Sequence, residues 1–178
     1  MSRAADPTLA ADLAAIATLR GSFLLRSGTM ADTYFDKYRF EGDPVLLRRL
    51  ADAMLALVPA ETQILAGLEL GGVPIATAMS LASGLPAVFV RKKAKDYGTC
   101  LAVEGGDVTG KRVLLIEDVI STGGAVADAV PLVRAAGAEI VGVACAIWRG
   151  EGAPGIAGLP GLPVRAAFTR GELEGAHA

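Results

Sequence analysis

The residues of this sequence with the clearest chemical meaning lie at positions 113–125, in the segment VLLIEDVISTGGA. Its apolar residues predict a strand that ends on two adjacent carboxylates, Glu117 and Asp118, and the polar turn 121–124 then begins a helix. A helix N-terminus presents unpaired N–H groups and a partial positive charge, so this turn suits a phosphate group. The carboxylates would repel that phosphate unless they face another part of the ligand, and a vicinal diol is a suitable partner. The segment therefore predicts a site for the ribose diol and 5-phosphate of a phosphoribosyl compound.

A second group of charged residues follows another expected strand, in the segment VRKKAKDYGT. Four cations occur there within five positions: Arg91, Lys92, Lys93 and Lys95. Taken alone, such a run usually belongs to a solvated surface. Beside a phosphoribosyl site it has a second interpretation, because a diphosphate leaving group needs cations to neutralise its growing charge.

The segment GGDVTGK (residues 105–111) has the glycines and the lysine of a P-loop but not its context. Arg112 follows where a P-loop has Ser or Thr, and the segment precedes an expected strand instead of following one. We therefore assign it to a turn. No G-x-G-x-x-G motif follows an expected strand, so a Rossmann dinucleotide site is not supported either.

The elements that must position these residues alternate along the chain from about position 63. Short apolar runs bounded by Gly, Pro or charge predict strands at 63–68, 86–91, 112–118, 139–148 and 163–168. Residues 73–83 and 124–137 have the pattern of helices. Continuously apolar strands between helices are typical of a mostly parallel sheet covered on both faces. We therefore expect an α/β fold with a mostly parallel central sheet flanked by helices, and ligands beyond the carboxyl ends of its strands.

The N-terminal part combines two helical patterns with an aromatic-rich segment. Apolar residues recur at helical spacing over positions 9–16, and Asp43 followed by Pro44 is typical of the start of a second helix. Between them, residues 23–43 hold five of the nine aromatic residues of the chain. The ordinary interpretation of that segment is a short hairpin that packs its aromatic side chains on the core.

Composition excludes several other kinds of protein. The chain has 178 residues and a formal net charge of −2, which suits one domain and gives no basic field for nucleic acid. Cys100 and Cys145 form no CxxC pair, and His177 is the only histidine, which argues against a zinc site, a disulfide framework and hydrolase triads. No apolar run approaches the roughly 18 residues of a membrane span, and the N-terminus lacks a signal-peptide pattern. We therefore expect a cytoplasmic protein that binds neither membranes nor nucleic acid.

The charged segments also resemble a known family. VLLIEDVISTGGA resembles the 5-phosphoribosyl 1-diphosphate (PRPP) signature of the type I phosphoribosyltransferases. RKKAKDYG resembles the R-K-x-x-K-D-H-G stretch of the orotate phosphoribosyltransferases, with Tyr97 where many members have histidine. Two further segments, LLRSGTMADTYFD and GLELGGVPIAT, are similar to segments of that family, so the resemblance extends from about Phe23 to Arg149.

The resemblance implies a role for individual residues. Glu117 and Asp118 would hold the ribose hydroxyls, and with the loop residue Lys95 they are the implied catalytic residues. The other implied PRPP-binding residues are Arg91, Lys92, Val119, Ile120, Ser121, Thr122, Gly123, Gly124, Ala125, Gly71 and Gly72. Many members have a lysine at the position of Gly71, so backbone amides would serve there in this chain. The implied orotate-binding residues are Arg26, Tyr34, Phe35, Ser121 and Arg149.

The resemblance also implies the reaction and the partners. PRPP and orotate would give orotidine 5'-monophosphate and diphosphate, a step of pyrimidine synthesis. Mg²⁺ would be carried by PRPP with no protein ligand, and loop cations shared between subunits would make a homodimer the working unit. Residues 1–178 would form a single type I phosphoribosyltransferase domain with a small N-terminal hood, mainly residues 20–42.

Two other functions remain open at this point. A phosphoribosyltransferase for a purine or another base would share the PRPP segment, but a neutral purine needs no arginine such as Arg149 for a carboxylate. A regulator that senses PRPP without catalysis would be expected to have a basic nucleic-acid surface or an added domain. The net charge of −2 and the length of the chain argue against the regulator.

Overall fold

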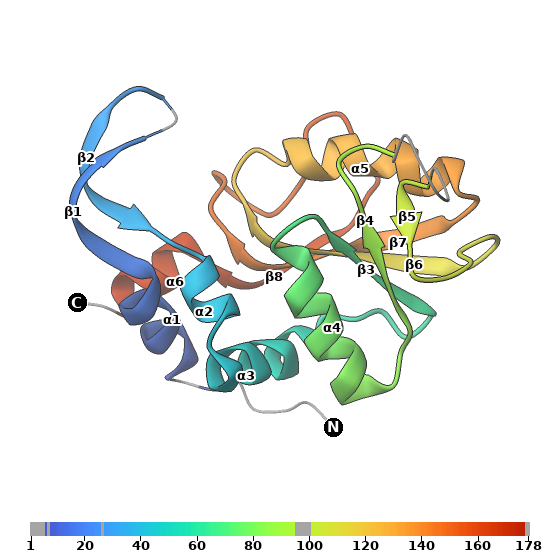
Figure 1. Ribbon diagram of the computed structural model, residues 1–178, viewed down its shortest axis with the longest axis horizontal. Coiled ribbons are helices and arrows are strands. Elements are labelled where there is room, and N and C mark those ends of the chain that lie inside the picture. Colours follow the sequence, from blue (N-terminus) through green and yellow to red (C-terminus); the bar gives the residue numbers. More distant parts are fainter. Residues whose placement is uncertain (1–5, 7, 26, 95–100, 177–178) are drawn as a thin grey trace.

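Strands and helices alternate from residue 64 onward in the computed structural model, which describes residues 6, 8–25, 27–94 and 101–176 (Figure 1). The strands are β3 (Ile64–Leu68), β4 (Ala87–Val90), β5 (Val103–Glu104), β6 (Arg112–Ile120), β7 (Glu139–Trp148) and β8 (Val164–Thr169). They form a six-stranded sheet in the order β5-β4-β3-β6-β7-β8, in which only the β4–β5 pair is antiparallel. The prediction of a mostly parallel central sheet is therefore confirmed.

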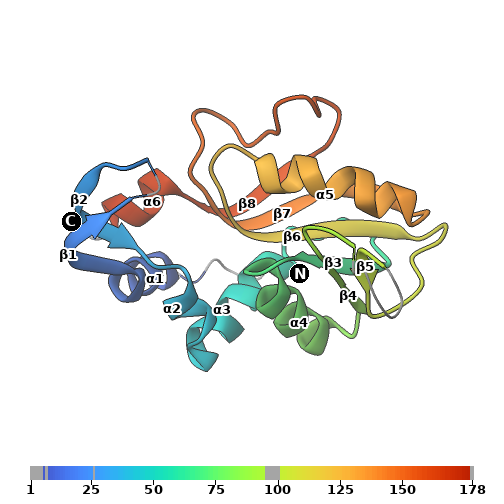
Figure 2. The same cartoon turned by 45° about the horizontal axis from the view of Figure 1, so that its top comes forward.

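Helices cover both faces of this sheet (Figure 2). They are α3 (Pro44–Leu55) and α4 (Gly72–Ser83) on one face and α5 (Gly124–Ala135) on the other, while α1 (Leu9–Ala17) packs on α3 at one end of the sheet. Successive residues of β6 point to opposite faces, so Leu114 packs in the core with α3 and α4 while Leu115 packs in the core with α5. This two-sided burial explains why the strands are apolar throughout.

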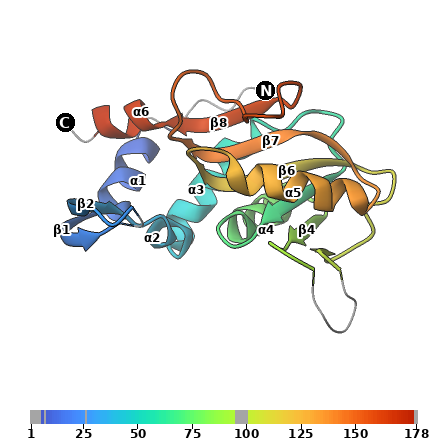
Figure 3. The same cartoon turned by 90° about the horizontal axis from the view of Figure 1, so that it is seen from above.

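The N-terminal segment forms a separate layer at one end of the sheet. β1 (Thr18–Leu24) and β2 (Met30–Phe35) pair as an antiparallel hairpin, and the short helix α2 (Tyr38–Glu41) follows. These three elements cover residues 18–41, close to the expected hood at 20–42, and we use the name hood for residues 18–41 from here on. The last helix, α6 (Arg170–Gly175), lies beside α1 at the same end of the molecule (Figure 3).

The structure extends the expectations from sequence at several points. β5, α2 and α6 were not predicted, because elements of two to six residues are too short to show a periodic pattern. The strand expected at 112–118 continues to Ile120, since Val119 and Ile120 still pair with β7. Both carboxylates therefore belong to a central strand and not to the turn after it. No helix in the described part of the chain is long and apolar enough to cross a membrane.

The N-cap of α3 can be tested by substitution. The Asp43 side chain accepts hydrogen bonds from Val45 N and Leu46 N, both at 2.9 Å. Asp43→Ala removes both acceptors, so we expect a loss of about 1 kcal/mol in the free energy of unfolding and a melting temperature about 2–4 °C lower. Asp43→Ser keeps a capping oxygen and should retain most of the stability. Calorimetry would contradict the assignment if the Ala variant melted with the wild type.

Candidate active site

The carboxylates at the end of β6 are buried in the interior. Glu117 is 6% exposed and Asp118 is 0% exposed. Asp118 N donates a hydrogen bond of 3.0 Å to Glu117 Oε1, and Val119 N donates to Asp118 Oδ1. Both side chains are thus tied to the backbone of their own strand, which fixes their positions at the carboxyl edge of the sheet.

The hood adds two charged side chains to this pair. Lys37, the residue before α2, has its Nζ 2.5 Å from Asp118 Oδ2, and its side chain is 32% exposed. Glu41 in α2 is buried and faces the same carboxylate. Sequence reasoning assigned no role to either residue, although Lys37 stands in the aromatic-rich segment two positions after Phe35.

Burial controls the charges in this cluster. Burial and the neighbouring Asp118 carboxylate raise the pKa of Glu117 to about 8 and the pKa of Glu41 to about 9. Burial also acts against ionised Asp118, but its hydrogen bonds with Glu117 and Lys37 outweigh burial and lower the pKa of Asp118. At neutral pH one carboxylate, Asp118, therefore faces one ammonium, Lys37, while Glu41 and Glu117 hold their protons.

The turn that begins α4 packs directly on these carboxyls. A Cβ on Gly71 would overlap the Asp118 carboxylate and would lie 2.9 Å from Glu41 Oε1. A longer side chain at position 71 is therefore incompatible with this position of Asp118.

The turn after β6 leads into the N-terminus of α5. Gly123 is the N-cap of α5 and has a φ of 78°, in the left-handed region that favours glycine. The side chain of Ile156 closes the space beside it, since a Cβ on Gly123 would lie 2.6 Å from Ile156 Cδ1. The other residues of the turn, Ser121, Thr122 and Gly124, are exposed to solvent. The turn therefore packs on Ile156 on one side and is open to a ligand on the other.

A cavity of about 420 Å³ lies in front of this turn. Of the predicted PRPP-binding residues, its lining includes Arg91, Lys92, Thr122, Gly124 and Ala125. The structure therefore brings the cations after β4 and the turn after β6 to the same space. The lining also contains two acidic residues that sequence reasoning did not select, Glu69 and Asp128, and Glu69 Oε2 accepts a 3.1 Å hydrogen bond from Lys92 N.

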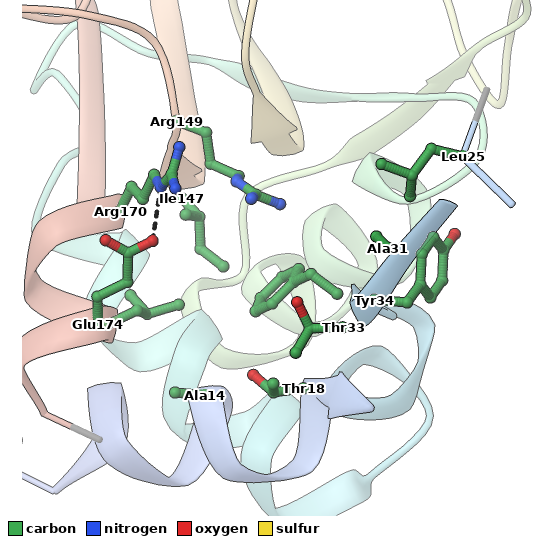
Figure 4. Close-up of a pocket in the computed structure, with 12 residues that line it drawn as sticks. Ala14, Thr18, Leu25, Ala31, Thr33, Tyr34, Ile147, Arg149, Arg170 and Glu174 are labelled. Carbon is green, nitrogen blue, oxygen red and sulfur yellow. Dashed lines mark hydrogen bonds and ion pairs between the residues drawn. The ribbon is translucent and has the colours of Figure 1, made fainter. Parts of the chain in front are cut away.

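A larger cavity of about 690 Å³ lies between the hood and the end of β7 (Figure 4). Tyr34, Phe35 and Arg149, which were predicted to bind orotate, all line it. The Cζ atom of Arg149 is 5.3 Å from the centroid of the Phe35 ring, so the guanidinium lies over an aromatic face. Arg149 N also donates a 2.8 Å hydrogen bond to Ile120 O, which ties the start of this cavity to the end of β6.

The C-terminal helix contributes a second arginine to this cavity. Arg170 and Glu174 of α6 both line it and form an ion pair of 2.6 Å with each other (Figure 4). Burial and the nearby positive charge of Arg170 lower the pKa of Arg149. This contact was not predicted, because no binding motif in the sequence marks Arg170 or Glu174.

Three predicted positions lie outside the described residues: Arg26, Lys95 and Tyr97. The assignments of Arg26 and Lys95 therefore stay predictions. Within the part of the chain that the structure describes, no group of three or more His, Cys, Asp or Glu side chains is arranged to hold a metal ion.

The comparisons with known proteins agree on one family of enzymes. Residues 46–156 match a family model described as the phosphoribosyl transferase domain. An orotate phosphoribosyltransferase of Nocardioides sp. is 57% identical over 172 residues, which cover 97% of this chain and 96% of that protein.

Solved structures give the same result. A crystal structure of Mycobacterium tuberculosis orotate phosphoribosyltransferase in complex with Fe(III) dicitrate has a TM-score of 0.82 and 35% identity, covering 94% of this chain and 97% of that chain. A second structure of that enzyme, in complex with PRPP, has a TM-score of 0.78 and 32% identity, covering 94% and 98%.

The buried carboxyl of Glu41 gives a pH-dependent contribution to stability. Its pKa rises from 4.5 to about 9 on folding, so the folded protein keeps a proton that the unfolded chain loses, and stability falls as pH rises through this window. Glu41→Gln cannot titrate. Between pH 6 and pH 9 we expect the wild-type melting temperature to fall at least about 2 °C further than that of the variant, the shift that about 1 kcal/mol produces.

Thermal unfolding at several pH values would measure this difference. The matched control is Glu139→Gln, at an exposed position outside the cluster, and it should follow the wild type. Parallel curves for the wild type and Glu41→Gln would contradict the assigned titration.

Proposed function

The chain belongs to the phosphoribosyltransferase family and is an orotate phosphoribosyltransferase, and we propose that the two cavities beside the end of β6 are its substrate-binding regions. The observation that carries this assignment is the position of the cavities on adjacent strands. Ile120 of β6 pairs with Trp148 of β7, Thr122 of the first cavity follows Ile120, and Arg149 of the second follows Trp148. A sugar phosphate in one region and a base in the other would meet beyond the ends of these two strands.

In this proposal, the first cavity binds PRPP. The 5-phosphate accepts hydrogen bonds from the exposed turn of Ser121, Thr122 and Gly124 at the N-terminus of α5, while Arg91 and Lys92 contact the diphosphate. The remaining positions that the resemblance implied, Lys95, Val119, Ile120, Gly71, Gly72, Gly123 and Ala125, keep their assignment as PRPP-binding residues. The related M. tuberculosis enzyme has been crystallised with PRPP, which supports a site of this kind.

Glu117 and Asp118 keep their assignment to the ribose hydroxyls in this proposal, although both are buried in the structure and neither lines the two cavities. Their contact with the ribose therefore requires PRPP binding to expose the carboxyl groups. The N1 atom of orotate, after it has lost its proton, attacks the anomeric carbon as the bond to diphosphate breaks, and positive charge develops on the ribose ring. A carboxylate fixed in a buried site stabilises such charge without reorganisation. The protein therefore contributes mainly by positioning the reactants and by electrostatics.

The second cavity binds orotate in this proposal. Arg149 presents a planar guanidinium that can contact the orotate carboxylate with two hydrogen bonds, and Tyr34 and Phe35 offer aromatic faces to the pyrimidine ring. Arg26 and Ser121 complete the set that the sequence implied. A purine, which has no carboxylate, would leave the Arg149 guanidinium without a partner.

The proposal also covers the metal and the assembly. We propose, as the family resemblance implies, that Mg²⁺ enters as part of the substrate, bound to PRPP. We further propose a homodimer in which the loop around Lys95 serves the neighbouring subunit, and a single domain over residues 1–178. We also propose that the enzyme is cytoplasmic, since both substrates are anions that do not cross membranes.

A two-substrate assay tests this function. PRPP is supplied with orotate, with adenine or with hypoxanthine, and diphosphate release is followed. Release with orotate alone is the expected result. Release with a purine would assign the chain to another base, and no release from any pair would favour a regulator that binds PRPP without catalysis.

Substitution of Arg149 tests the orotate region. Arg149→Met keeps the length of the side chain but loses the charge, so we expect the KM for orotate to rise at least about tenfold, because a hydrogen bond to a charged group contributes about 1.5–3 kcal/mol. The KM for PRPP should change less than about twofold. Arg134→Met, at an exposed position in the last turn of α5, is the control. Equal effects on both substrates would argue against a contact with orotate.

A further inference from the structure

Lys37 is a cation beside Asp118 that comes from a different element than the cations after β4 and lines neither of the two cavities. Arg91 and Lys92 line the cavity in front of the α5 turn. Lys37 comes from the hood, and its ammonium lies 2.5 Å from Asp118 Oδ2. The same carboxylate fills the space where a Cβ of Gly71 would lie, so the Lys37 ammonium sits next to the turn that begins α4.

The carboxyl groups at this point create an electrostatic problem for an anionic ligand. Glu41, Glu117 and Asp118 lie together at the edge of the α4 turn. A diphosphate at that turn would come close to the ionised Asp118, and two anions at such a distance repel each other strongly where water is excluded. A cation between them removes this repulsion.

Lys37 has the chemistry and the exposure to be that cation. An ammonium has three donors, and one contact with Asp118 leaves donors for a phosphate oxygen. The Lys37 side chain is 32% exposed while Asp118 is fully buried, so the ammonium is the accessible member of the pair. Gly71 and Gly72 have no side chain that could take this part.

We propose that Lys37 is a diphosphate-binding residue, whose ammonium bridges the buried Asp118 and the diphosphate of PRPP. This inference rests on the proposed assignment of the region around Asp118 and the α4 turn to PRPP. It makes the hood part of the PRPP site as well as of the orotate site. The lysine that the sequence lacks at position 71 is thereby replaced by one from another element.

Binding of three ligands to Lys37→Met tests the bridge. Titration calorimetry at fixed Mg²⁺ measures PRPP, diphosphate and ribose 5-phosphate. We expect the Kd values of PRPP and diphosphate to rise at least about tenfold, while that of ribose 5-phosphate changes less than about twofold. Lys37→Arg, which keeps a cation, should recover much of the diphosphate affinity. Lys111→Met, at an exposed position before β6, is the matched control.

A second variant covers the case in which loss of the ammonium leaves Asp118 unpaired and the protein unstable. Lys37→Met combined with Asp118→Asn removes both charges and is compared with Asp118→Asn alone. Diphosphate should bind at least about tenfold more weakly to the double variant.

Three results separate the alternatives. Unchanged diphosphate affinity in Lys37→Met would overturn the proposal. An equal loss for all three ligands would overturn it too, because the effect of the substitution would then not be specific to the diphosphate group. Failure of the wild type to release diphosphate from PRPP with orotate would instead refute the assigned reaction, and these binding measurements do not depend on that outcome.

Discussion

Asp118 carries a negative charge at a position with no solvent exposure, and such a charge is stable only beside a partner. The partner is Lys37, which belongs to the hood, so the ion pair also fixes where the hood meets the sheet. Glu41 and Glu117 can lie beside the pair because burial keeps both protonated at neutral pH. The contact also bears on the larger cavity, because the hood forms one wall of it.

The turn between β6 and α5 depends on a different kind of support. Gly123 needs a left-handed backbone, and the side chain of Ile156 fills the space where any larger residue would project. Ile156 belongs to the Gly- and Pro-rich segment between β7 and β8, and Trp148 Nε1 donates a 3.0 Å hydrogen bond to Gly152 O of the same segment. A stretch without any chemical motif therefore holds the turn from behind.

Much of the fold follows from local patterns. A parallel sheet covered on both faces requires strands that are apolar throughout, and the strands from β3 to β8 were recognisable for that reason, except for the two residues of β5. The α3 helix was recognisable from Asp43 and Pro44, whose capping interactions are made within three residues. In contrast, α2 has four residues, and its position depends on the hood packing against the sheet.

The residues of the candidate site also fall into two groups, those that could be recognised from the sequence and those that only the fold brings together. From the sequence we could select two sets of candidate binding residues, the segment from Glu117 to Ala125 and the cations Arg91 and Lys92. Each set is contiguous in the chain, so its pattern can be recognised without the fold. It also indicated Tyr34, Phe35 and Arg149 through their resemblance to a family, and the structure brings these three to one cavity. Only the tertiary structure decided that Lys37 and Glu41 meet Asp118 and that Arg170 lies beside Arg149. These contacts join residues far apart in the sequence, and their charges depend on burial, which a linear pattern of residues does not contain.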